Sequence, residues 1–163
     1  SKPDVLYQYA ILGSLYAEYV YNIHSPKVGL LNIGKEEEKG NLLTKTTYQA
    51  MKDTTDFNFI GNVEGNDIFN DNVDVMVCDG FVGNVLLKQV EAFYDLVKKR
   101  EPYDDFFEKY NYVDYGGSPI LGINAPVIIG HGISNDMAIK NMILNTINVI
   151  KANLVNKFKE AFE

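Results

Sequence analysis

The 163-residue sequence contains few of the residues that build several common kinds of site. Cys78 is the one cysteine, which excludes a disulfide framework and a zinc site built on several cysteines. Arg100 is the one arginine, so an anion site must use lysine, backbone N–H groups or a partner chain. No apolar run reaches the roughly 20 residues that a membrane-spanning helix needs. The single cysteine favours a reducing, cytoplasmic setting.

Positive charge is also scarce. Lys and Arg total 15 against 22 Asp and Glu, and the net charge of -7 argues against nucleic-acid binding. Hydrophobic residues make up 46% and charged residues 23%, as in folded globular proteins of about one ordinary domain. Because the chain begins at Ser1 inside a helical pattern, we expect it to be a piece of something longer.

Apolar runs alternate with helical patterns, which predicts an α/β fold with a layered, mostly parallel sheet and flanking helices. The predicted helices cover residues 3–21, 44–52, 83–99 and 134–162, with a short helix over 101–110. The predicted buried strands cover residues 28–33, 57–60, 73–78 and 127–129, and residues 115–119 read as a loop. Ser1 and Ser134 are the expected N-caps of the first and last helices.

Each predicted strand ends in a small, polar segment. In open α/β sheets ligands bind at the carboxyl ends of the strands, where glycine admits a ligand to the backbone and helix N-termini favour anions. The strongest such segment is 79–84, for which we expect open amides around Gly83, Asn84 and Val85. A tight turn that only reverses the chain is an equal alternative.

Two lysines and two histidines need separate readings. Lys39 could reach over the strand ends, or could simply balance the acidic run 36–38. Lys88 could be a solvated surface lysine on its helix. His131, between two glycines after a strand, favours a functional role over core packing, whereas we expect His24 to be exposed. Neither histidine has a Ser or Cys at a spacing that predicts a triad.

Three carboxylates could act as acid or base, namely Glu64, Asp79 and Glu91. Asp79 is the best placed because it ends a strand, whereas we expect Glu91 to be solvated on a helix. Four aspartates match no Ca²⁺ loop, so we expect turn and capping roles and no metal; they are Asp67, Asp71, Asp74 and Asp79. Cys78 should be a buried, inert thiol.

Five glycine-rich segments follow one another along the chain, at residues 28–40, 59–68, 74–88, 115–122 and 130–134. They include VGLLNIG followed by EEEKG, then FIGNVEG, CDGFVGNV, YGGSPILG and GHGIS. In this order they resemble signature segments of the PlsX family, the bacterial acyl-[acyl-carrier-protein]:phosphate acyltransferases. The resemblance covers essentially the whole chain. Ala92 departs from the family's usual glycine, and the connection between Glu91 and Tyr115 is short.

The resemblance implies an enzyme that moves a fatty acyl group from acyl carrier protein to inorganic phosphate, forming acyl phosphate for phospholipid synthesis. It implies the fold of isocitrate and isopropylmalate dehydrogenases and phosphotransacetylases, a homodimer, and no cofactor, metal or nucleic acid. This chain would be the carboxy-terminal half, with the amino-terminal half absent. A cytoplasmic location is expected, with peripheral contact at the inner face of the membrane as the minority reading.

On this resemblance, Lys39 and Asn84 bind the phosphate, together with the amides of Gly83 and Val85. Asp79 orients Lys39 or handles a proton, and His131 stabilises the thioester oxyanion or the leaving thiolate. The other expected substrate-binding residues are Gly34, Gly40, Asn62, Gly80, Gly116 and Gly117.

Two alternatives remain open. One is a phosphotransacetylase-like enzyme that takes its acyl group from coenzyme A. The other is a non-catalytic dimerisation or docking half, in which the apolar face of the last predicted helix packs against a partner.

Overall fold

The computed structural model describes residues 1–100, 102 and 104–163, which form two compact units. The first unit comprises residues 1–80 and 156–163, and the second comprises residues 81–155. Each unit is described by itself.

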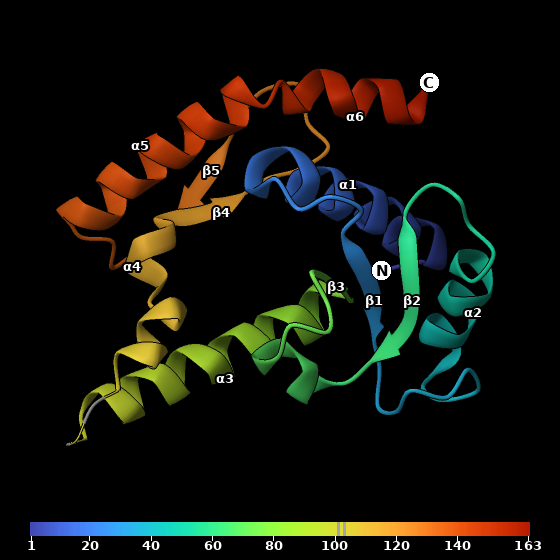
Figure 1. Ribbon diagram of the computed structural model, residues 1–163, viewed down its shortest axis with the longest axis horizontal. Coiled ribbons are helices and arrows are strands. Elements are labelled where there is room, and N and C mark those ends of the chain that lie inside the picture. Colours follow the sequence, from blue (N-terminus) through green and yellow to red (C-terminus); the bar gives the residue numbers. More distant parts are fainter. Residues whose placement is uncertain (101, 103) are drawn as a thin grey trace. The chain divides into compact units, whose positions relative to one another are not determined.

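The first unit contains a parallel three-stranded sheet, which confirms the predicted α/β class (Figure 1). Its strands are β1 (Lys27–Leu31), β2 (Asn58–Val63) and β3 (Val75–Val77), in the order β2-β1-β3. Both neighbours pair with the central strand in parallel, so all three carboxyl ends lie at one edge. The centre of β1 is fully buried, as its continuous apolar sequence predicts.

Helices α1 (Pro3–Tyr21) and α2 (Leu42–Met51) contact each other and pack on this sheet. Their core consists of buried apolar side chains from both helices and the strands: Leu6, Ala10, Ile11, Val28, Leu30, Met51, Phe57 and Val77. A short 3-10 helix, η1 (Gly65–Phe69), follows β2. Most of α6 (Leu154–Phe162) also belongs to this unit, where Lys157 Nζ lies 5.2 Å from the centre of the Tyr19 ring.

The local sequence explains the bounds of α1. Pro3 stands in the first turn, where its missing N–H costs nothing, and Asn22 ends the helix in the left-handed conformation with φ of 58°. The N-cap is Lys2, without a side-chain hydrogen bond, so the prediction of Ser1 as the cap is wrong. Gly13 faces β3, because a Cβ there would lie 2.6 Å from Val75 Cγ1.

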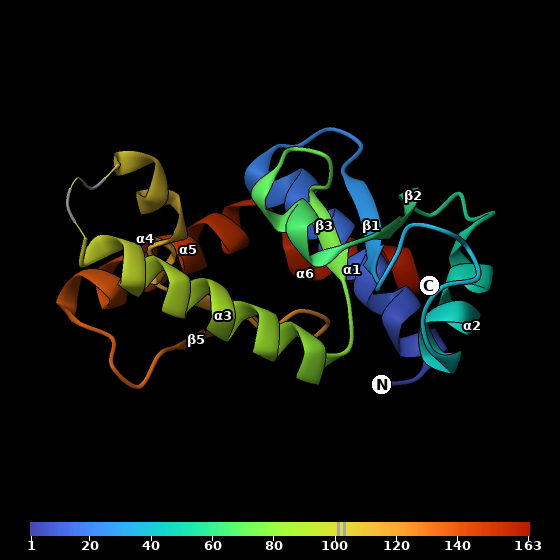
Figure 2. The ribbon, with the colours of Figure 1, turned by 90° about the horizontal axis from the view of Figure 1, so that it is seen from below.

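The second unit carries the long helix α3 and helix α5 (Figure 2), together with a small two-stranded sheet (Figure 1). Its elements are α3 (Gly80–Lys98), η2 (Asp105–Tyr110), α4 (Tyr112–Tyr115), β4 (Gly117–Pro119), β5 (Ile128–Gly130) and α5 (Asp136–Lys151). Helix α4 packs against α5, and Asn141 Nδ2 of α5 donates to the carbonyl oxygen of Val113 at 2.9 Å.

The fourth predicted strand does not join the parallel sheet. It is β5, which pairs antiparallel with β4, a segment that we expected to be a loop. Nor is it buried, because the central Ile129 is 56% exposed. An apolar run of three residues does not identify its pairing partner, so the prediction of a buried parallel strand was wrong.

The last predicted helix is two helices, α5 and α6, separated at Asn153 with φ of 52°. Asparagine adopts this left-handed conformation more readily than most residues. The cap of α5 is Asn135 rather than Ser134, and its side chain accepts from the Ala138 N–H at 2.9 Å. The short helix expected over 101–110 is η2, while residues 101 and 103 lie outside the described residues.

Among the described residues, no helix combines the length and the apolar character needed to cross a bilayer.

Candidate functional site

Two asparagines hold the loop that follows β1 at the carboxyl edge of the parallel sheet. Asn32 Nδ2 donates to the carbonyl oxygen of Lys39 and to Asn62 Oδ1, each at 3.1 Å. Asn62 Nδ2 donates to the carbonyl oxygen of Glu36 at 2.8 Å. Asn62 is only 5% exposed, so the two bonds that its side chain forms are partly shielded from water. Asn62, an expected substrate-binding residue, thus uses its side chain to fix the loop of residues 32–40.

Glycines let this loop turn back tightly. Gly40 has φ of 93°, a conformation that L side chains rarely adopt, and a Cβ there would collide with the Asn32 and Thr44 side chains. Gly34 is buried, and a Cβ on it would lie 3.0 Å from Lys39 Cγ. The stem of Lys39 therefore packs over the Gly34 backbone.

Lys39 is exposed, and within the described part of the chain its ammonium forms no ion pair. Glu37 pairs instead with Lys52, at 3.4 Å between Oε1 and Nζ. A hydrogen bond from Gln49, and then the charge of Lys52, lower the pKa of Glu37. Lys39 also forms no ion pair with Asp79, so the geometry leaves its charge available to an anion.

Asp67 is the buried carboxylate of this edge, with 2% exposure. It accepts from the Glu64 N–H at 2.9 Å, from Asn70 Nδ2 and from Lys35 Nζ, each of the latter at 3.2 Å. These contacts, the backbone bond first, lower the pKa of Asp67. It forms a capping box with Glu64 at η1, which confirms the predicted capping role.

Asp79 lies directly between β3 and the start of α3. Burial, and then the charge of Asp79, raise the pKa of the neighbouring Cys78 thiol. A raised pKa keeps the thiol protonated and unreactive.

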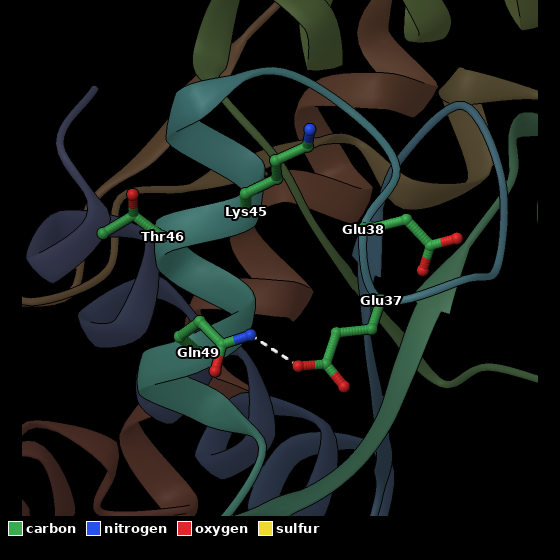
Figure 3. Close-up of a pocket in the computed structure, with 5 residues that line it drawn as sticks. All are labelled: Glu37, Glu38, Lys45, Thr46 and Gln49. Carbon is green, nitrogen blue, oxygen red and sulfur yellow. Dashed lines mark hydrogen bonds between the residues drawn. The ribbon is translucent and has the colours of Figure 1, made fainter.

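A hollow of about 480 Å³ opens between this loop and α2 (Figure 3). Its lining residues are Glu37, Glu38, Lys45, Thr46 and Gln49. Figure 3 shows Glu37 directed toward Gln49 and Glu38 directed away from α2. Two carboxylates against one ammonium make this hollow unsuitable for phosphate.

A second, polar hollow of about 470 Å³ lies beside the amino ends of β1 and β2. Pro26, which precedes β1, and Asn58, which begins β2, both line it. His24 also lines it and is exposed, as expected. This is the edge opposite the one at which ligands bind in open α/β sheets.

The start of α3 differs from the prediction. The helix begins at Gly80, three residues earlier than expected. By α-helical geometry, the Gly83, Asn84 and Val85 amides bond to carbonyls one turn earlier, so the expected open amides belong to residues nearer Gly80. Asn84 itself is exposed on the second turn, where its side chain can still meet a ligand.

The second unit brings together a cluster that includes two residues of uncertain role in the sequence. Lys88 Nζ donates to Glu91 Oε2 at 2.7 Å, and His131 Nε2 lies 3.3 Å from Glu91 Oε1. The side chains of Glu91 and His131 are 29% and 35% exposed. Glu91 is therefore engaged with His131, and is more than the solvated helix carboxylate that its position in the sequence predicted.

Gly116 and Gly117 have a packing explanation. Gly116 is buried with φ of 76°, and a Cβ there would lie 2.7 Å from the Asn141 carbonyl carbon in α5. A Cβ on Gly117 would lie 3.0 Å from Ile128 Cγ2 in β5. Both glycines allow close backbone approach within the second unit. Among the described residues, no group of three or more His, Cys, Asp and Glu could hold a metal ion.

The geometry thus supplies two sets of polar groups, each within one unit: an exposed lysine on a glycine-rich loop, and a cluster of lysine, glutamate and histidine. Comparison with known proteins gives the class. A family model described as "fatty acid synthesis protein" matches residues 1–101. The chain belongs to this family, the PlsX family of phosphate acyltransferases.

Among curated proteins, the phosphate acyltransferase of Halothermothrix orenii is 43% identical over 98% of this chain and 54% of that relative. The phosphate acyltransferase of Brevibacillus brevis is 40% identical over 100% of this chain and 54% of its own length. That of Helicobacter acinonychis is 42% identical over 99% and 53%. The chain therefore spans about half the length of the curated relatives that it matches.

Proposed function

We propose that this chain is the carboxy-terminal portion of an acyl-[acyl-carrier-protein]:phosphate acyltransferase. The enzyme would supply acyl phosphate for phospholipid synthesis. The observation that carries the proposal is the 40–43% identity to phosphate acyltransferases over nearly all of the chain.

The chemistry suits the polar groups of the chain. A phosphate oxygen attacks the thioester carbonyl carbon, a tetrahedral oxyanion forms, and the C–S bond breaks. The carrier thiolate leaves and takes up the proton that hydrogen phosphate gives away. No protein nucleophile is needed, because holding the phosphate and stabilising the oxyanion supply the catalysis.

We assign phosphate binding to Lys39 and to Asn84. The ammonium of Lys39 is exposed and has no ion-pair partner among the described residues, and the loop that carries it is fixed; both observations support the first assignment. His131 would stabilise the oxyanion or the leaving thiolate. We assign Asp79 to proton handling rather than to the orientation of Lys39, because the two form no ion pair.

We further propose that the whole protein is a cytoplasmic homodimer with an isocitrate dehydrogenase-like fold. Exposed apolar side chains on α5, at Ile143, Ile147 and Ile150, support a partner-covered face. Sedimentation of the whole protein would test the dimer, and a vesicle flotation assay would test peripheral membrane contact.

The decisive experiment compares donors for the whole protein. Acyl phosphate should form from acyl carrier protein thioester and phosphate. Formation from acyl-coenzyme A alone would favour the phosphotransacetylase-like alternative, and no product from either donor would favour a docking role. The isolated chain should show little turnover, and rapid turnover would contradict its assignment as an incomplete half.

The Lys39 assignment has its own test. Lys39→Ala in the whole protein should lower the rate by about 100-fold or more, because it removes a charge that meets the transferred group. Lys45→Ala, an exposed lysine on the neighbouring helix, is the matched control and should leave the rate unchanged. Circular dichroism should show both variants folded. An unchanged rate in Lys39→Ala would remove Lys39 from the site.

A further inference from the structure

One carboxylate of the second unit joins two basic side chains. Glu91 places Oε2 at 2.7 Å from Lys88 Nζ and Oε1 at 3.3 Å from His131 Nε2. Each carboxylate oxygen thus has a different basic partner. With 29% of its side chain exposed, Glu91 is partly shielded from water.

The two partners come from different parts of the second unit. Lys88 lies one turn earlier on α3, and an exposed pair at this spacing contributes little to stability by itself. His131 comes from the loop after β5, far along the chain. The contact with Glu91 therefore ties that loop to α3 through the imidazole ring.

A carboxylate determines which imidazole nitrogen carries a proton. Ionised glutamate only accepts hydrogen bonds, so its contact with Nε2 favours the tautomer that carries the proton on that nitrogen. Asn84 lies one turn before Lys88 and two turns before Glu91, so the three residues share one side of α3.

We propose that Glu91 is a positioning residue for acyl transfer. It holds His131 with Nε2 protonated and keeps the Lys88 ammonium beside it, so that His131 meets developing negative charge in one orientation. This inference rests on the proposed function, in which His131 stabilises the oxyanion or thiolate. Glu91 acts through His131 and does not itself touch the substrate.

The first test is kinetic and uses the whole protein. Glu91→Gln keeps the shape and removes the charge, and kcat should fall about 10–100-fold, the range for a misplaced reacting group. The KM for phosphate should stay within about threefold, because positioning of His131 acts on the transition state. Glu91→Asp should recover part of the loss. An unchanged kcat in Glu91→Gln would overturn the proposal.

The chain provides a matched control in α6. Lys157 and Glu160 form a pair with the same spacing, at 3.1 Å, without a histidine. Glu160→Gln should leave kcat unchanged. An equal loss in both variants would assign the effect of Glu91→Gln to a helix ion pair in general, and would overturn the proposal.

The second test asks whether Glu91 acts through His131. The double variant Glu91→Gln/His131→Gln should be no slower than His131→Gln alone, since a positioning residue has no further effect once its partner is gone. Losses that multiply would show two independent roles and would overturn the inference.

The third test needs no activity. The ¹⁵N signals of the His131 imidazole, identified by their loss in His131→Gln, should change in Glu91→Gln as the proton redistributes between the two nitrogens. Unchanged signals would overturn the positioning role. If the unmodified protein forms no acyl phosphate, the proposed function fails, and these signals still decide whether Glu91 positions His131.

Discussion

The two units differ in how their apolar residues are buried. In the first, Leu6, Val28, Leu30 and Met51 are 0–1% exposed in one core cluster. In the second, α5 leaves Ile143 58% and Ile150 59% exposed. The first unit therefore draws its stability from a core of its own. The second relies more on local contacts, among them the close backbone approach at Gly116 and the Asn135 cap.

The prediction with the largest expected effect tests whether the first unit has the better-filled core. Leu30→Ala should lower the free energy of unfolding by about 2–5 kcal/mol, because it opens a cavity in a filled core. Ile143→Ala should change it by about 0.5 kcal/mol or less. Urea titration of both variants measures the two values. A loss above about 1 kcal/mol at Ile143 would mean that its face is buried in solution, and the contrast between the units would narrow.

Backbone packing in the second unit comes next. Gly116→Ala should cost about 1–3 kcal/mol, because the new methyl group meets the α5 backbone and the left-handed conformation disfavours alanine. Gly132→Ala is the control, since a Cβ there meets no atom within 4 Å. Thermal melting compares the two. Equal melting temperatures would show that α5 can shift to admit the methyl group.

The helix caps sharpen the comparison further. Asn41 caps α2 of the first unit and Asn135 caps α5 of the second, each by accepting from a backbone N–H. Each change to alanine should cost about 1 kcal/mol. Calorimetry then separates the units: if they unfold independently, each variant shifts a different transition. A single transition that shifts equally in both variants would mean that the units unfold together.

The smallest effect concerns Asp67→Asn, since asparagine is also a good cap. A lowered pKa means that the Asp67 carboxylate adds stability above the ordinary aspartate pKa of about 3.9 and loses it as pH falls through the lower folded value. The variant should be less stable than the parent at neutral pH and converge with it in strong acid. Denaturation curves measured from pH 7 to pH 2 test this, and a gap that persists in acid would contradict it.

Sequence patterns predicted most of the first unit. Helix α1 was expected over its observed range, because Pro3 and a regular apolar period mark it clearly. The central strand was recognised by its unbroken apolar run. The second unit was harder, since strands of three residues carry no period, and β5 was placed in the wrong sheet. The end of α5 at Asn153 lacks the glycine or proline that usually marks such a stop.

The polar residues of the candidate site were likewise predicted only where a local sequence pattern marks them. The glycine-rich loop with Lys39 could be predicted as a candidate site, because ligands bind at the carboxyl ends of the strands in open α/β sheets. The role of Asn32 could not be predicted from the sequence, because it depends on a hydrogen bond to Asn62. The two residues meet only when β1 and β2 pair in the sheet. Glu91 was expected to be solvated, since its contact with His131 arises only when a distant loop meets α3. Contacts between segments far apart in the sequence are therefore the part of the site that could not be predicted from individual residues.

The position of α6 at the end of the chain affects how the first unit folds during protein synthesis. Most of α6 belongs to the first unit, although all 75 residues of the second unit, 81–155, are translated between them. At a translation rate of about 5–20 residues per second, the first unit waits about 4–15 s for the ring contact of Lys157 with Tyr19. During that interval the nascent first unit presents the surface that α6 later covers, so chaperones or misfolding have time to act there.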